Sequence, residues 1–173
     1  YRTSTVIGAH GTRVARTPTN QAAADLVRDQ RADTWWTPDP ASPLEDWWLE
    51  IDLGRVVLAS RVRLVFADTA GVQPFRFFSV YTSPGLPIAA SPQDLYFTRA
   101  GGTIKANSSR VVEFDLAARN PSEATGLYLD TSERLSFDPT RFVRFVAEAK
   151  LEGAALAEVQ VESIGENIAL KAT

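Results

Sequence analysis

The side chains that could carry out covalent or metal chemistry are few in this sequence. Its 173 residues include no Cys, and the single His is His10. The lack of Cys excludes disulfides, Cys-ligated zinc and thiol nucleophiles, and one His argues against a Ser-His-Asp triad. Carboxylates are plentiful, but local spacing fixes no two of them near each other, although a glycosidase could use two distant ones. We therefore expect no catalytic residue.

The charge and hydropathy of the chain argue against three further classes of protein. The sequence has 18 Lys and Arg against 21 Asp and Glu, a net charge of −3, whereas a nucleic-acid binder usually presents a basic face. No run of about 20 apolar residues occurs, so we expect no transmembrane segment. Apolar residues make up 45% of the chain, which is enough to build a packed core and argues against disorder.

The elements that must position any binding residue are short strands. In residues 60–67 the apolar side chains alternate, with Val62, Leu64 and Phe66 on one side, which is the period of a strand with one solvated face. The one candidate helix is residues 19–28. Further strands are expected at residues 47–53, 75–83, 94–99, 110–116, 126–130, 141–147 and 156–164. Turn signals separate these segments, and such a series predicts an all-β sandwich or barrel.

Four segments together resemble the coagulation factor 5/8 type C (discoidin) domain family. Residues 48–54 (WLEIDLG) are similar to its W-L-x-V-D-L-G strand, the most specific of these motifs. Residues 29–36 (DQRADTWW) resemble its early D-G-D-x-x-T-x-W loop, residues 141–145 (RFVRF) its A-R-Y-V-R-L strand, and residues 156–161 (LAEVQV) its closing strand. The family has the galactose-binding-like fold and is similar to family 32 carbohydrate-binding modules. The resemblance implies an antiparallel jelly-roll β-sandwich.

The same resemblance implies one structural calcium ion, held by the early loop. Calcium binds about six to eight oxygens from carboxylates, hydroxyls and backbone carbonyls. The ligand set that the resemblance implies consists of the side chains of Asp29, Thr34 and Glu158 and the carbonyl groups of Leu26 and Arg31. If bound, the ion would hold the loop ends together and take no part in chemistry.

Two positions of this loop depart from the family pattern. Gln30 replaces a Gly, which matters if the backbone there needs a positive φ, and Arg31 replaces the second Asp. The alternative to a calcium site is that Asp29 and Asp33 only cap a turn, or pair with Arg28 or Arg31.

The resemblance also implies a ligand face made of end loops, where sugars stack on exposed aromatic rings. Neighbouring residues of a strand face opposite ways, so a buried Trp48 would leave Trp47 facing outward or lying under a loop. Trp36 resembles the family's core Trp, which leaves Trp35 nearer the surface. The candidate ligand residues are Trp35, Trp47, Tyr96, Phe97 and His10. In the alternative, both Trp side chains only cover sheet edges or the calcium loop.

We expect residues 1–165 to form this domain. Residues 166–173 would be a linker or the start of a following domain, because NIALKAT (residues 167–173) resembles the opening of another discoidin-type domain; an ordinary frayed terminus is the alternative. These features indicate a non-catalytic, extracytoplasmic binding module for carbohydrate or adhesion within a larger protein. The alternative function is a structural module that docks on a neighbouring protein subunit.

Overall fold

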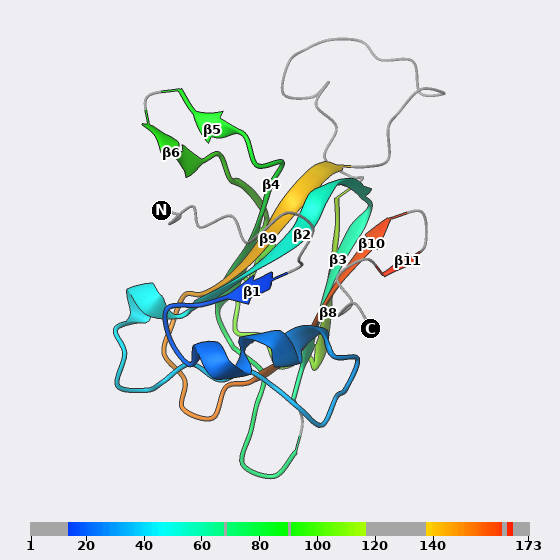
Figure 1. Cartoon of the computed structure of the whole chain (residues 1–173). Helices are drawn as coiled ribbons and strands as arrows, with labels where there is room; N and C mark the ends of the chain where they lie inside the picture. Colours follow the sequence, from blue (N-terminus) through cyan, green and yellow to red (C-terminus); the bar gives the residue numbers. More distant parts are fainter. Residues whose placement is uncertain (1–13, 68, 90, 117–137, 164–165, 168–173) are drawn as a thin grey trace.

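The computed structural model shows a sandwich of two β-sheets (Figure 1), and it describes residues 14–67, 69–89, 91–116, 138–163 and 166–167. Within these residues, one sheet has the strand order β1-β2-β9-β4-β7 and the other the order β11-β10-β3-β8, while β5 and β6 form a separate hairpin. All pairings between these strands are antiparallel. The predicted antiparallel β-sandwich is therefore confirmed.

Most of the strands are short, and two 3₁₀ helices accompany them. The five-stranded sheet consists of β1 (Val14–Arg16), β2 (Trp48–Ala59), β9 (Asp138–Ala147), β4 (Phe78–Ser83) and β7 (Thr98–Gly102). The four-stranded sheet consists of β11 (Glu166–Asn167), β10 (Leu156–Ser163), β3 (Arg61–Phe66) and β8 (Val111–Asp115). The remaining elements are the hairpin strands β5 (Pro87–Ile88) and β6 (Ser91–Leu95) and the helices η1 (Gln21–Arg28) and η2 (Leu44–Asp46).

Several strand predictions are confirmed, and others needed correction. The alternation in residues 60–67 is confirmed, since Val62, Leu64 and Phe66 of β3 are fully buried. The single strand expected at residues 94–99 is wrong, because a break after Leu95 separates β6 from β7. The expected helix exists as the 3₁₀ helix η1. The strand expected at residues 126–130 lies outside the described residues, and the domain boundary after residue 165 stays a prediction.

Strand β2 continues beyond Gly54, where the sequence predicted its end. Gly54 has a φ of 76°, and the pairing with β9 shifts register between Asp52 and Val57. The Asp52 carboxylate supports this irregularity, because its Oδ1 accepts a hydrogen bond of 2.8 Å from the Gly54 amide. Arg141 on β9 adds two hydrogen bonds of 3.0 and 3.1 Å to the same carboxylate, and this contact raises the pKa of Arg141. A positive-φ Gly thus bends the strand without ending it.

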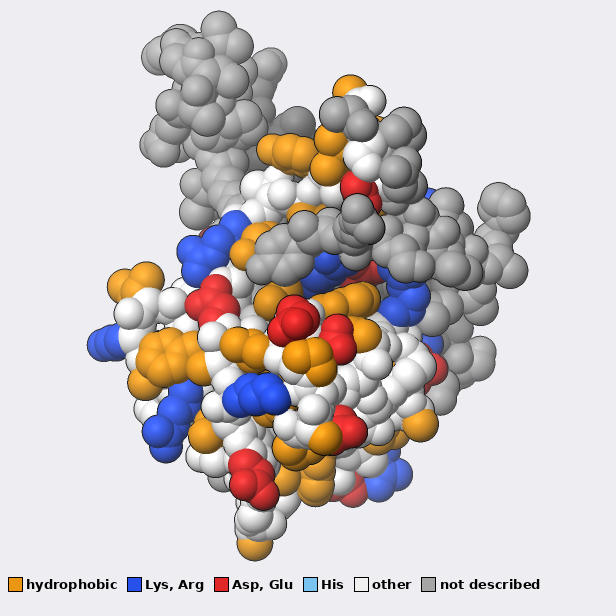
Figure 2. Space-filling view, turned by 90° about the vertical axis from the view of Figure 1, so that its left-hand side faces the viewer, with side chains coloured by type: hydrophobic (Ala, Val, Ile, Leu, Met, Phe, Trp, Pro, Cys, Tyr) orange, Lys and Arg blue, Asp and Glu red, His pale blue; other side chains and the backbone are white. Residues whose placement is uncertain are grey.

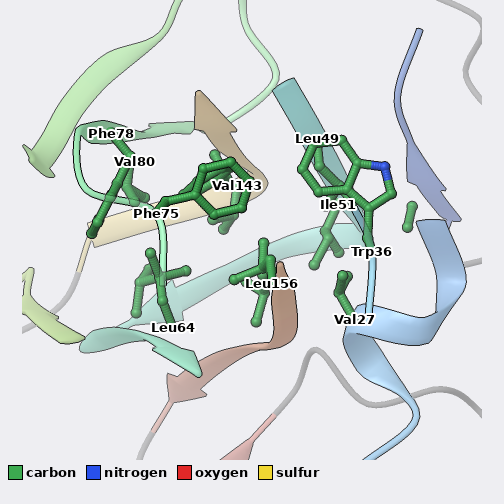
Figure 3. Close-up of a cluster of buried hydrophobic side chains, with 14 of the residues drawn as sticks. Val27, Trp36, Leu49, Ile51, Leu64, Phe75, Phe78, Val80, Val143 and Leu156 are labelled. Carbon is green, nitrogen blue, oxygen red and sulfur yellow. The ribbon is translucent and has the colours of Figure 1, made fainter. Parts of the chain in front are cut away.

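Aromatic and aliphatic side chains fill the space between the two sheets (Figure 3). Phe75 lies in the middle of this cluster and is fully buried. Its ring centroid is 4.9 Å from that of Phe145, 6.0 Å from that of Phe66 and 6.3 Å from that of Trp36. Edge-on, tilted and stacked ring pairs of this kind add to the stabilisation from burial. The core thus joins β3 and β9 to the two loops that carry Trp36 and Phe75.

Removing the central ring should destabilise the sandwich strongly. Phe75→Ala is expected to lower the free energy of unfolding by about 3–5 kcal/mol, since the surrounding rings cannot collapse fully into the cavity. Phe77→Ala is the matched control, because Phe77 is two residues away and 37% exposed, and it should change the value by only about 0.5 kcal/mol. Urea unfolding curves measure both values. Equal losses in the two variants would contradict the central place of Phe75.

Candidate binding pocket and metal loop

Strand β2 and the residue before it present two different faces. Trp47, Leu49 and Ile51 point into the core and are at most 2% exposed. The alternate residues Trp48 and Glu50 lie on the outer face of the five-stranded sheet, and the Trp48 side chain is half-buried. The expectation that Trp48 lies in the core is therefore wrong, and Trp47 lies under a loop and does not face outward. The apolar residues that follow at every second position place Trp47 inside and leave Trp48 to reach the surface.

Trp47 belongs to the packing beneath the loop that precedes β2. Its indole Nε1 donates a hydrogen bond of 3.3 Å to the Ser42 carbonyl. Its backbone amide donates to the Leu44 carbonyl at 2.9 Å, at the end of η2. The Lys150 Nζ lies 5.6 Å from the ring centroid. Trp47 therefore holds the loop in place and has no free face for a ligand.

An open pocket lies where Trp48 reaches the surface, and its volume is about 720 Å³. The residues that line it come from the segment between β1 and η1, from η2, β2 and β9, and from the segment after β9; they are Pro18, Leu44, Glu45, Asp46, Trp48, Arg144, Val146, Ala147 and Glu148. Figure 2 faces this side of the molecule and shows charged side chains of both signs among hydrophobic ones. A pocket with an aromatic ring and a few polar groups is typical of small-ligand sites.

Thr19 positions the loop that forms one rim of the pocket. Its buried Oγ1 accepts hydrogen bonds from the Asp39 amide at 2.9 Å and from the Ser42 hydroxyl at 3.2 Å. Its carbonyl accepts a hydrogen bond of 3.2 Å from the Trp36 indole. The chain just before η1 is thus tied both to the core and to residues 37–46, which carry Glu45 and Asp46 to the pocket.

A buried ion pair lies in the sheet below the pocket. Glu50 is fully buried, and Arg144 is 3% exposed. The Arg144 Nε donates to the Glu50 Oε2 at 3.0 Å, and its Nη2 donates to the same oxygen. Arg16 pairs with the other carboxylate oxygen of Glu50. A buried carboxylate needs such partners, because an unpaired charge in the interior is strongly destabilising.

The other predicted ligand residues lie in different places. Trp35 is partly buried against a small cluster of Ala67, Ala155 and Ala157. Tyr96, which follows β6, is 57% exposed. His10 lies outside the described residues. None of Trp35, Trp47 and Tyr96 lines the pocket, whereas Trp48, which the sequence motif placed in the core, does.

The predicted metal-loop residues do come together. The Thr34 hydroxyl donates a hydrogen bond of 2.8 Å to the Asp29 Oδ2. The Arg31 amide is 2.9 Å from both the Asp29 Oδ1 and the Glu158 Oε1. The Leu26 carbonyl accepts a hydrogen bond of 3.5 Å from the Asp29 amide. The early loop and the closing strand thus meet around two carboxylates, although Arg31 and Glu158 are 127 positions apart in the sequence.

Glu158 is the unusual member of this group. Its side chain is buried, and its Oε2 has no hydrogen-bond partner. Burial raises the pKa of Glu158 to about 8, the Asp29 carboxylate beside it adds to the increase, and the Arg31 amide opposes it. The unpartnered Glu158 oxygen, the Asp29 carboxylate, the Thr34 hydroxyl and the carbonyls of this loop are the kinds of oxygen ligand that calcium takes. The residues present therefore fit the ion.

The two departures from the family pattern have local solutions. Gln30 takes the left-handed conformation with a φ of 65°, which is allowed but unfavourable for a residue with a Cβ. The Arg31 guanidinium turns to Asp33, with hydrogen bonds of 3.0 and 2.8 Å, and both side chains are exposed. The positive charge is therefore engaged on the surface, while the Arg31 carbonyl stays next to the Thr34 hydroxyl at 3.3 Å.

No protein-family model matches the chain, and no curated protein sequence matches it either. Solved structures do match. The module CpGH89CBM32-6 from Clostridium perfringens is similar with a TM-score of 0.59 and 14% identity, over 90% of this chain and 96% of that one. The family 32 carbohydrate-binding module of C. perfringens NanJ, solved with galactose, is similar with a TM-score of 0.58 and 13% identity, over 86% and 92%.

A third similar structure is chitosan-binding module 2 of a chitosanase/glucanase from Paenibacillus sp. IK-5, solved with chitotriose. It has a TM-score of 0.55 and 19% identity, and the match covers 88% of this chain and 97% of that one. Identities this low establish the architecture alone. The resemblance read from the sequence motifs is thereby confirmed for the architecture, and this chain has the galactose-binding-like fold of the family 32 carbohydrate-binding modules.

Proposed function

We propose that this protein is a non-catalytic carbohydrate-binding module that takes a sugar in the pocket beside Trp48. The observation that carries the proposal is the half-buried Trp48 side chain in a pocket with Glu45 and Asp46 at its rim. The C–H face of a sugar can lie on the indole, while carboxylate oxygens accept hydrogen bonds from its hydroxyls. Neither carboxylate has an ion-pair partner among the described residues.

The structural neighbours support this class of ligand without naming the sugar. One was solved with galactose and another with chitotriose, so the same fold binds different sugars in different proteins.

The proposal places the module outside the cytoplasm, in adhesion or ligand capture for a larger protein with a further domain after residue 166. No helix in the described ranges is long and apolar enough to cross a membrane.

The proposal includes one structural calcium ion in the metal loop. The side chains of Asp29, Thr34 and Glu158 and the carbonyls of Leu26 and Arg31 would hold it. The orphaned Glu158 Oε2 supports this assignment, because a buried carboxylate oxygen without a partner is costly. A bound calcium ion would supply charge compensation and would tie η1 to β10.

A second candidate function, docking on a neighbouring protein subunit, is favoured by the β5–β6 hairpin. Leu86 is 64% exposed, and Ile88 is also exposed. Tyr96, just beyond the hairpin, adds an exposed ring. Exposed apolar groups close together often mark protein–protein contacts. This surface is separate from the pocket-lining residues, so the two functions can be tested independently.

Sugar binding should depend on Trp48. Trp48→Ala is expected to weaken the binding of galactose or chitotriose by at least about tenfold, which corresponds to about 1.4 kcal/mol, because the stacking surface is lost. Isothermal titration calorimetry measures the dissociation constants, and thermal melting shows whether the variant is folded.

Tyr96→Ala is the matched control for this experiment, because Tyr96 is an exposed ring outside the pocket. It should leave the affinity unchanged. Loss of binding in Tyr96→Ala but not in Trp48→Ala would move the site to the hairpin. If the wild-type protein binds none of the sugars in a broad glycan panel, that result would contradict sugar binding and favour docking.

Calcium should raise the melting temperature of the full chain. An ion that binds only the folded state stabilises it by mass action, by about 2.7 kcal/mol at a hundredfold excess over its dissociation constant. Glu158→Gln should abolish most of the shift between millimolar calcium and a chelator. Asp33→Asn is the control, because Asp33 pairs with Arg31 on the surface, and it should keep the shift. A wild-type melting curve that is identical with and without calcium would rule the site out.

A further inference from the structure

The guanidinium of Arg144 lies over two aromatic rings next to the pocket. Its Cζ is 4.7 Å from the centroid of the Trp48 ring and 4.4 Å from that of the Phe97 ring. Arg144 belongs to β9 and Trp48 to β2, whereas Phe97 lies in the turn between β6 and β7. Cation–π contacts of this kind gain strength when the cation is shielded from water, and Arg144 is only 3% exposed.

Glu50 fixes the plane of this guanidinium by binding one of its edges. The Arg144 Nε and Nη2 both donate to the Glu50 Oε2. Glu50 and Arg144 are also directly opposite each other in the β2–β9 register, and Arg16 is opposite Glu50 in the β1–β2 register. The buried carboxylate therefore sits in a row across three paired strands. A guanidinium held in this way cannot rotate without breaking a buried ion pair.

We propose that Arg144 is a positioning residue that holds the indole of Trp48 in the orientation a sugar uses. This inference rests on the proposed function of the pocket. A ring that is already ordered loses less side-chain freedom when the ligand binds, and this raises affinity. The planar shape of Arg is essential, because a Lys ammonium keeps the charge for Glu50 but lacks a flat surface to place against the ring.

Phe97 separates this role from a purely structural one. Its side chain is half-buried, and it contacts Arg144 but lines neither the pocket nor the main core cluster. Phe97→Leu removes one of the two rings on the guanidinium and leaves Trp48, the Glu50 pair and the pocket lining in place. If Arg144 serves stability alone, this variant changes the melting temperature and not the affinity.

The order of the Trp48 ring can be measured on the full chain without any ligand. The protein has four Trp residues, and 5-fluorotryptophan labelling gives each a ¹⁹F resonance, with Trp48 assigned by its loss in Trp48→Phe. In Phe97→Leu and Arg144→Lys, the Trp48 resonance should narrow and move toward the random-coil shift, while the other three stay in place. Phe77→Leu, which alters an exposed Phe that does not line the pocket, should leave all four unchanged.

Affinity is the second measurement, with galactose and chitotriose as probes in calorimetric titrations. Phe97→Leu and Arg144→Lys should weaken binding by about 2- to 30-fold, the range that a cation–π contact spans from exposed to shielded sites. The melting temperature of Phe97→Leu should stay close to that of Phe77→Leu. Arg144→Lys is the more disruptive change, because it also alters the buried ion pair with Glu50. If Arg144→Lys unfolds, Phe97→Leu alone decides the question.

Two results would overturn the positioning role. One is an unchanged Trp48 resonance in the folded Phe97→Leu variant. The other is a mobile Trp48 ring together with unchanged sugar affinity. Failure of the proposed function looks different, because the wild-type protein itself then binds neither sugar, while the ¹⁹F spectra still report whether Phe97 and Arg144 hold the ring.

Discussion

The alternation of side chains along β2 is the constraint on which both the core and the candidate site depend. One set of residues, with Leu49 and Ile51, closes the space between the sheets. The other set, with Trp48 and Glu50, lies on the outer face, where it supplies a ring to the pocket and a carboxylate to the buried ion pair. Because the period of a strand is two, a slip of one residue would exchange the two sets completely. The core and the candidate site therefore depend on the same register of this strand.

The outer face of the five-stranded sheet is more polar and more buried than a simple sandwich predicts. An antiparallel sheet can leave its outer face in water, yet Glu50 and Arg144 are almost completely buried there. A buried ion pair is weak evidence of stability, because desolvation offsets much of the attraction. Here the ion pair fixes orientation: the Arg16 and Arg144 guanidiniums both bind the Glu50 carboxylate, and this holds Arg144 against the rings of Trp48 and Phe97. The metal loop has the opposite character, since a carboxylate oxygen of Glu158 is left without a partner.

Much of the architecture could be predicted from local patterns, whereas the site could be predicted only in part. The alternation of Val62 and Leu64 predicts β3, and the closing motif brings Glu158 to the early loop. Trp48 was misplaced because motif similarity outweighed the alternation of Leu49 and Ile51, which already showed the correct face. The contact between Arg144 and Phe97 has no local signal, since it depends on the pairing of β9 with β4 and of β4 with β7. Long-range pairing of this kind is invisible in spacing along the chain.

The dependence of residues 37–46 on Thr19 divides the pocket into two parts with different freedom to vary. The aromatic floor is built into a paired strand, whose register the core also fixes. The acidic rim, with Glu45 and Asp46, is carried by a loop that Thr19 anchors at Asp39 and Ser42. Substitutions between these anchors and Trp47 can alter the polar groups offered to a ligand while the floor stays in place. Under the proposed function, such a division would allow one scaffold to acquire new ligand preferences by changing a short stretch of chain.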